Sequence, residues 1–144
     1  MADVFSPARQ ARTWRDLWIA LAETERDLGV DVPEAAIEAM RSARDEVDLA
    51  RVAELEADLR HDVMAHVHHF GELAPGAKAY IHLGATSCFV TDNAGLIQLR
   101  HGLKIVRSRL VAAIASLAGF ADQWKDLASL GYTHWQPAQP TTVG

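Results

Sequence analysis

Apolar residues recur at helical spacing through the first half of the chain, and this pattern predicts three helices before residue 71. The first follows the N-cap and first-turn pair Ser6-Pro7, and Gly29 is placed to end it. The second begins at Pro33, and the third runs from the N-cap Asp48 to about residue 70. The apolar faces comprise Trp14, Leu17, Trp18, Leu21 and Leu28 in the first helix, Ile37 and Met40 in the second, and Val52, Leu55, Leu59, Val63, His66 and Phe70 in the third.

Periodicity stops over 71–84, where prolines and glycines indicate a loop, and then resumes as a heptad repeat. One row of the repeat is Leu96, Leu103, Leu110, Leu117 and Trp124, and the other is Leu99, Val106, Ala113, Phe120 and Leu127. The two rows form a seam over roughly thirty-five residues, or on the order of 50 Å of helix. The helix is expected to end at Gly131.

These patterns predict an all-α protein in which a small helical domain precedes a long helix. Apolar residues also lie off the heptad seam, so the long helix should be buried among several partners, as in a helical bundle. The partner helices are not in the sequence. We therefore expect the chain to be a fragment of a longer protein, with other chains as the alternative source of partners.

Composition excludes several classes of protein. A hydrophobic content of 49% supports a packed core, and a net charge of -5 argues against a nucleic-acid-binding domain. The single cysteine, Cys88, excludes an internal disulfide and a cysteine-based zinc site. No apolar stretch is long enough to span a membrane, and the first residues lack a signal-peptide pattern, so a cytoplasmic location is expected.

Three polar segments interrupt the helical pattern, and they hold most of the histidines. We call them the first, second and third islands. They are Arg60 to His68, with Arg60, His61, Asp62, His66 and His68; Ile81 to Cys88, with His82, Thr86 and Ser87; and Thr133 to Gln139, with Thr133, His134 and Gln136.

Each island has a structural explanation when it is considered alone. His66 lies on an apolar face and is most simply a core histidine, while His68 and His69 could meet the dipole at a helix end. The His61-Asp62 pair could be solvated, Thr86 and Ser87 could cap the long helix, and the segment around residue 134 could be a turn. A metal site is not favoured, because no two of these histidines have one-turn spacing with a third ligand.

Considered together, the islands favour an anionic substrate. Arg60, Thr86, Ser87, Thr133 and Gln136 offer donors for phosphate and carboxylate oxygens. A histidine in such surroundings can serve as a general acid near neutral pH.

The islands also resemble conserved blocks of one enzyme family. Leu59-Arg60-His61-Asp62-Val63-Met64-Ala65-His66-Val67 resembles the first block of adenylosuccinate lyases of the animal type, within the aspartase/fumarase superfamily. His82-Leu83-Gly84-Ala85-Thr86-Ser87 looks like the second block, and Thr133-His134-Trp135-Gln136-Pro137-Ala138-Gln139 looks like the third. The similarity extends from about Thr13 to Gly144. Argininosuccinate lyases and fumarases match these blocks less well.

The resemblance implies an architecture. In this family a small N-terminal helical domain, here 1–85, precedes a central helical-bundle domain, which would begin at 86 and be truncated at 144. Four subunits pool their bundles, so the resemblance implies a homotetramer whose active sites are each shared by three subunits. No cofactor is implied.

The resemblance also implies a reaction, the β-elimination of fumarate from adenylosuccinate to give AMP, and from the succinyl-carboxamide ribonucleotide of purine biosynthesis. By resemblance His134 is the general acid and His61 supports it.

The remaining resemblance-based roles concern substrate binding. Arg60 and Asp62 would hold the nucleotide, His82 would line the site, and Thr86, Ser87 and Gln136 would bind the succinyl carboxylates beside Thr133. Hydrogen-bond donors that bind the carboxylate on which negative charge builds in the transition state are expected to contribute most to the rate.

Two elements of the family pattern have no match in these residues: the general-base serine on a glycine-rich loop, and an Arg-Tyr substrate-binding element. The chain by itself is therefore expected to be inactive. The alternatives are another fumarate-releasing lyase of the superfamily and a non-catalytic helical oligomerisation module that uses the heptad seam.

Overall fold

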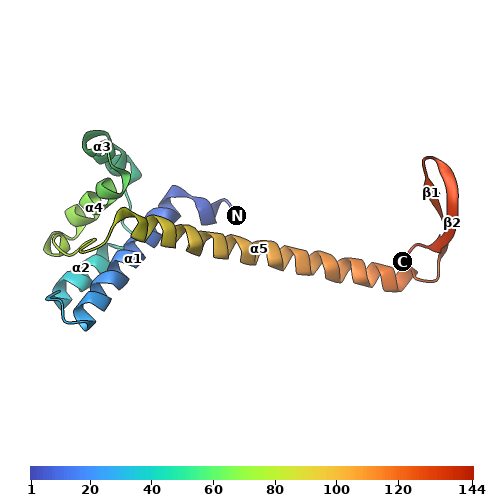
Figure 1. Ribbon diagram of the computed structural model, residues 1–144, viewed down its shortest axis with the longest axis horizontal. Helices are drawn as coiled ribbons and strands as arrows, with labels where there is room; N and C mark the ends of the chain where they lie inside the picture. Colours follow the sequence, from blue (N-terminus) through green and yellow to red (C-terminus); the bar gives the residue numbers. More distant parts are fainter. The chain divides into compact units, whose positions relative to one another are not determined.

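A computed structural model describes all of residues 1–144, and Figure 1 shows its helices and strands along the chain. The residues form two compact units, Met1–Gly102 and Leu103–Gly144. The elements are η1 (Asp3–Phe5), α1 (Pro7–Asp27), α2 (Glu34–Ala43), α3 (Leu49–Leu59), α4 (Asp62–Leu73), η2 (Pro75–Ala77), α5 (Ser87–Trp124), β1 (Ala128–Thr133) and β2 (Gln136–Thr142). The predicted all-α class is confirmed, with one small hairpin added.

The first two helices begin and end where the sequence signals predict. The Ser6 side chain accepts the Arg9 N–H at 3.2 Å, which caps α1, and Gly29 follows the helix with a φ of 93°. Pro33 is the N-cap residue of α2. Both helices pack their apolar faces into the core of the first unit, so these boundary predictions are confirmed.

The prediction of a single third helix is wrong, because the helix is interrupted at residues 60–61 and two helices form instead. Asp48 does cap α3, accepting from the Ala50 and Arg51 N–H groups at 2.9 and 3.1 Å. Arg60 then takes a left-handed conformation with a φ of 56°, and His61 caps α4 with its ring nitrogen. Neither residue is a usual terminator of a helix, so the continuous apolar pattern concealed the break. The predicted loop is also shorter, because α4 continues to Leu73.

The core of the first unit surrounds two tryptophans of α1. Trp14 and Trp18 are both buried and lie edge to face, with ring centroids 6.2 Å apart. Side chains from α2, α4 and the start of α5 complete the core. They are Ile37, Met40, Val63, Phe70 and Val90, all fully buried.

Only the beginning of α5 is buried in the first unit. Its buried residues are Val90, Ala94, Gln98 and Gly102. Gln98 donates to the Val4 carbonyl at 2.9 Å. The Phe5 ring packs against Gly102 so closely that a Cβ added there would lie 3.1 Å from it. These contacts join the amino terminus to the first turns of α5.

The heptad seam lies on α5, as predicted, and it is exposed within this chain. Leu96, Leu103, Leu110 and Leu117 each expose more than half of their surface. Burial of the seam in a bundle stays a prediction, because the helices that would cover it are not among these residues. No helix is both long and apolar enough to cross a bilayer.

The end of the chain differs from the prediction. The helix ends at Trp124 rather than at Gly131, and β1 and β2 pair as an antiparallel hairpin. Leu127 continues the seven-residue spacing, and Gly131 is the next residue that would end a helix, so the pattern extended the prediction past Trp124. The prolines of β2 are tolerated because each strand of a two-stranded sheet is an edge strand.

Candidate functional site

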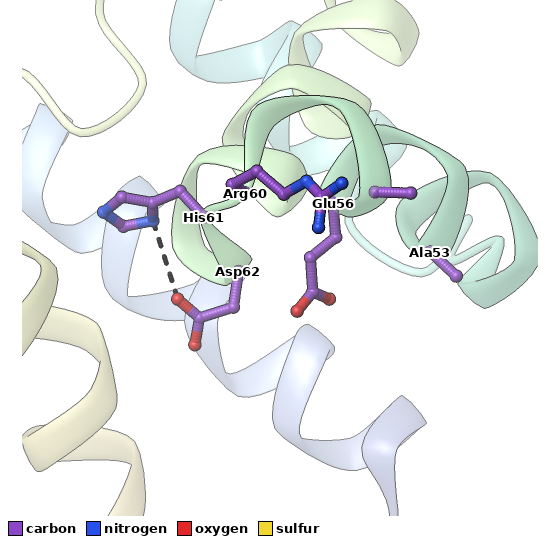
Figure 2. Close-up of a pocket in the computed structure, with 6 residues that line it drawn as sticks. Ala53, Glu56, Arg60, His61 and Asp62 are labelled. Carbon is purple, nitrogen blue, oxygen red and sulfur yellow. Dashed lines mark ion pairs between the residues drawn. The ribbon is translucent and has the colours of Figure 1, made fainter.

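The first island lies at the junction of α3 and α4, around an open hollow of about 720 Å³. Arg60, His61 and Asp62 line it from the junction, and Ala53, Glu56 and Ala57 line it from α3. Figure 2 shows these side chains gathered around the hollow. Arg60 and His61 offer hydrogen-bond donors to an anion here, while Glu56 and Asp62 add two carboxylates to the same lining.

His61 is held by contacts with both of its ring nitrogens. Nδ1 accepts the Met64 N–H at 3.4 Å and lies 3.5 Å from Asp62 Oδ1, while Nε2 lies 3.5 Å from Ser87 Oγ. Asp62 also accepts the Val63 N–H at 2.7 Å, in the first turn of α4. These contacts fix the orientation of the His61 ring at the junction of the two helices.

The second island meets the first through Ser87, whose Oγ lies 3.5 Å from His61 Nε2. Ser87 begins α5, and Thr86 immediately precedes it, accepting the Phe89 N–H with its backbone carbonyl at 2.9 Å. The amino-terminal end of this long helix therefore faces His61, and helix amino termini favour anions. Thus the structure brings the first and second islands together, as the anion interpretation requires.

His82 is fixed by a residue far away in the sequence. Its Nδ1 accepts the Trp18 indole N–H at 3.0 Å, which leaves the ring proton on Nε2. Burial lowers the pKa of His82, and the nearby His61 lowers it further. His82 is therefore a neutral donor at physiological pH. No sequence signal indicated that Trp18 orients this histidine.

The third island forms the turn of the β1–β2 hairpin in the second compact unit. Thr133 pairs with Gln136, and His134 and Trp135 form the two-residue turn with φ values of 50° and 64°. Positive φ at both central positions defines a type I′ turn, which strongly favours Asn and Gly. The two aromatic side chains occupy it at a cost in backbone energy.

Backbone strain coincides with the islands. The non-glycine residues with positive φ are Arg60, His82, His134 and Trp135, and three of these were predicted as site residues from the sequence. Strained residues persist where the surrounding structure enforces them, and they cluster at functional sites. The assignment of function to the three islands stays a prediction, and the positive φ values are consistent with it.

Trp135 is a residue that the sequence interpretation missed. It is 98% exposed, and with Tyr132 and His134 it lines an open hollow of about 680 Å³. The sign that could have revealed Trp135 is its residue type, since a tryptophan is unusual in a turn position that favours glycine. The third island belongs to a different compact unit from the first two, so convergence of all three on one anion stays a prediction.

Two other histidines of α4, His66 and His69, serve the core. The His66 ring lies edge to face with Trp14 at 4.8 Å, and burial lowers its pKa to about 4. His69 is 4% exposed and accepts the Asp48 N–H, so the idea that it meets the helix dipole as a cation is wrong. Burial lowers the pKa of His69 as well, which keeps it neutral.

Comparison with known proteins assigns the chain to a protein family. The chain belongs to the lyase family, whose pattern matches residues 8–144. Within that family it is similar to adenylosuccinate lyases, which confirms the resemblance found in the sequence. The Saccharomyces cerevisiae enzyme is 52% identical over the whole chain, and the Schistosoma mansoni enzyme is 50% identical over 97% of it. The chain spans about 30% of the length of these relatives.

Solved structures of the superfamily share the fold. The 3-carboxy-cis,cis-muconate lactonizing enzyme from Pseudomonas putida is 28% identical over 98% of this chain, with a TM-score of 0.86, and the chain covers 33% of it. The fumarate lyase from Mesorhizobium sp. BNC1 is 27% identical over 97% of this chain, with a TM-score of 0.85, and the chain covers 33% of that structure. Their different names show that the fold alone does not determine the substrate.

Proposed function

We propose that these residues form the anion-binding and general-acid part of an adenylosuccinate lyase, acting on a succinyl-bearing purine nucleotide in the cytoplasm. The observation that carries the proposal is that left-handed backbone occurs at Arg60, His82 and His134, one residue in each island that matches the family's blocks. The 52% identity to the yeast enzyme supports the same substrate.

In the proposed reaction a base removes a proton beside a succinyl carboxylate. The electron pair of that C–H bond becomes the double bond of fumarate as the C–N bond breaks. His134 donates the proton that the departing nitrogen takes up, giving AMP from adenylosuccinate or the carboxamide ribonucleotide from its succinyl adduct. An exposed imidazole at the hairpin turn suits a proton donor that must reach the departing atom.

We assign the substrate's anionic groups to the remaining residues. Arg60 and Asp62 hold the nucleotide from the α3–α4 junction. His61 binds the phosphate of the substrate and in this way supports the general acid. Neutral His82 donates from the wall of the site. The carboxylates are bound by Thr86 and Ser87 at the start of α5 and by Thr133 and Gln136 in the hairpin. These donors stabilise the charge that builds on one carboxylate in the transition state.

A chimeric enzyme tests the proposal directly. Replacing the 147-residue matching segment of the yeast adenylosuccinate lyase with this chain should give a protein that releases fumarate from adenylosuccinate at a rate comparable with the parent. The parent supplies the rest of the active site. The matched control carries the corresponding segment of the Mesorhizobium fumarate lyase, which shares the fold and should not support the reaction. A folded chimera of this chain that releases no fumarate would refute the proposal.

We further propose that the exposed seam of α5 packs in a homotetrameric bundle. Leu110, more than half exposed, lies on the seam and Ser108 lies off it. The 144-residue chain is expected to associate in sedimentation-equilibrium experiments, because an apolar face of this length is costly in water. Leu110→Lys should weaken the association and Ser108→Lys should not. A stable monomer at micromolar concentration would contradict the assembly.

A further inference from the structure

Helix α3 forms one wall of the hollow around Arg60 and His61, yet few apolar contacts hold it. Val52 is its only buried residue, and Leu59 at its carboxyl end is 39% exposed. The free energy gained by hydrophobic burial is proportional to the apolar area removed from water, so the burial of one valine stabilises the packing of α3 only weakly. The position of this wall must therefore depend on polar contacts.

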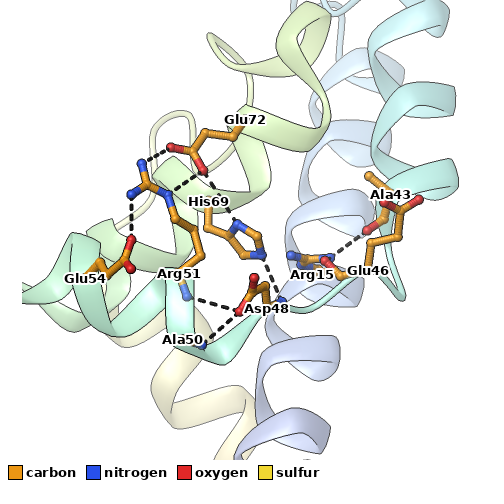
Figure 3. A network of polar contacts seen from close by, with 9 residues as sticks. All are labelled: Arg15, Ala43, Glu46, Asp48, Ala50, Arg51, Glu54, His69 and Glu72. Carbon is orange, nitrogen blue, oxygen red and sulfur yellow. Dashed lines mark hydrogen bonds and ion pairs between the residues drawn. The ribbon is translucent and has the colours of Figure 1, made fainter.

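Those polar contacts lie at the amino-terminal end of α3, and Figure 3 shows them as a connected network. His69 Nε2 accepts the Asp48 N–H at 3.1 Å, which joins α4 to the N-cap of α3. Arg51 makes two hydrogen bonds to Glu72 of α4, at 3.1 and 2.6 Å. Of these side chains His69 alone is buried, so its bond is the one sheltered from water.

We propose that His69 is a positioning residue, whose neutral imidazole, together with the Arg51–Glu72 ion pair, latches α3 onto α4 and so holds the anion-binding hollow in shape. The part of this inference that concerns substrate rests on the proposed lyase function. His69 does not touch the hollow. It acts through α3, which contributes Ala53, Glu56 and Ala57 to the wall.

The latch depends on the protonation state of His69. A protonated imidazole donates from both nitrogens, so Nε2 could no longer accept the Asp48 N–H. The charged groups around the ring are Arg15 from α1, Asp48, Arg51 from α3, and Glu72 on α4 with its Oε2 3.8 Å from Nδ1. His66, one turn earlier on α4, is a second titratable neighbour, and its own pKa is lowered by His69 among other causes.

The balance of these groups favours the neutral ring. Burial is the main cause of the lowered pKa, and Arg15 reinforces it, while Glu72 and Asp48 oppose it. Since a histidine ordinarily titrates near pH ~6.5, the latch is closed at neutral pH and opens only on the acid side of that value.

Two substitutions separate the latch from general stability. In His69→Gln the amide oxygen can accept the Asp48 N–H at every pH, and in His69→Leu no acceptor remains. In the chimeric lyase, His69→Leu should raise KM for adenylosuccinate roughly five- to tenfold with kcat retained, the effect of losing one buried hydrogen bond. His69→Gln should keep the neutral-pH KM and should lose the rise in KM that the unsubstituted chimera shows on the acid side. His68→Gln, on the same helix, is the matched control for both.

Hydrogen exchange on the 144-residue chain provides a readout that needs no catalysis. The Asp48 amide should be protected at neutral pH, should lose that protection on the acid side, and should keep it in His69→Gln. Equal acid-side KM profiles for the unsubstituted and His69→Gln chimeras, or an unprotected Asp48 amide, would overturn the inference. If His69→Leu fails to fold, the His69→Gln comparison decides. A chimera without lyase activity would refute the proposed function, and the exchange experiment would still test the latch.

Discussion

Replacing His134 with asparagine in the chimeric lyase is expected to lower kcat by about a hundredfold or more, with the fold retained. Asparagine is the informative choice because residue 134 has a φ of 50°, a conformation that asparagine tolerates better than alanine. The hairpin turn should therefore survive while the proton donor is lost. Steady-state fumarate release under saturating substrate measures the effect.

The controls for this prediction address folding and specificity. Circular dichroism and sedimentation should show the same helix content and assembly for the His134→Asn and unsubstituted chimeras. His68→Gln, which alters a histidine with no assigned role, should leave kcat unchanged. An unaltered kcat in His134→Asn would remove His134 from the acid role while leaving the family assignment intact.

Replacing Arg15 with methionine is expected to lower the free energy of unfolding of the first unit by about 3–5 kcal/mol, the range for breaking a buried charged network. Arg15 is 2% exposed, and its Nη1 donates to the carbonyls of Ala43, Arg44 and Glu46 at 2.6, 3.1 and 2.9 Å. Its guanidinium carbon also lies 4.6 Å from the centre of the Phe70 ring. Methionine retains most of the volume, so the loss reports mainly on the unpaired carbonyls at the end of α2.

The charge of Arg15 is retained despite its burial. Burial lowers its pKa to about 10, and Glu46 and Asp45 partly offset that effect. The side chain is therefore a cation at neutral pH and donates to the carbonyls in its charged form. Loss of Arg15 would also relieve the repulsion that helps to keep His69 neutral.

Urea unfolding followed by tryptophan fluorescence measures this prediction, because Trp14 and Trp18 lie in the same core. Arg12→Met is the matched control, since Arg12 lies on the same helix and is not fully buried. Its side chain makes no hydrogen bond or ion pair. Its expected effect is within about 0.5 kcal/mol. A similar loss in both variants would show that the buried contacts of Arg15 add no stability beyond that of a partly exposed arginine on the same helix.

Local signals in the sequence predicted most of the helices. Ser6, Pro7 and Asp48 act within a few residues of the helix starts that they define, so their effects can be inferred without tertiary contacts. The break at Arg60 escaped prediction, and a turn at His134 was only one interpretation of its segment, because neither place has the residue types that usually produce such conformations. At both places the backbone conformation departs from local preference, as happens where the surrounding structure enforces it.

The sequence by itself determined the helical class, the seam of α5, the three islands and the family. These depend on periodicity and on short motifs, which are properties of neighbouring residues. The tertiary structure alone decided that His61 meets Ser87, that Trp18 orients His82, and that His69 joins α4 to the cap of α3. Each of these contacts joins residues more than twenty positions apart, and the packing of the core, rather than any local preference, sets which distant side chains meet.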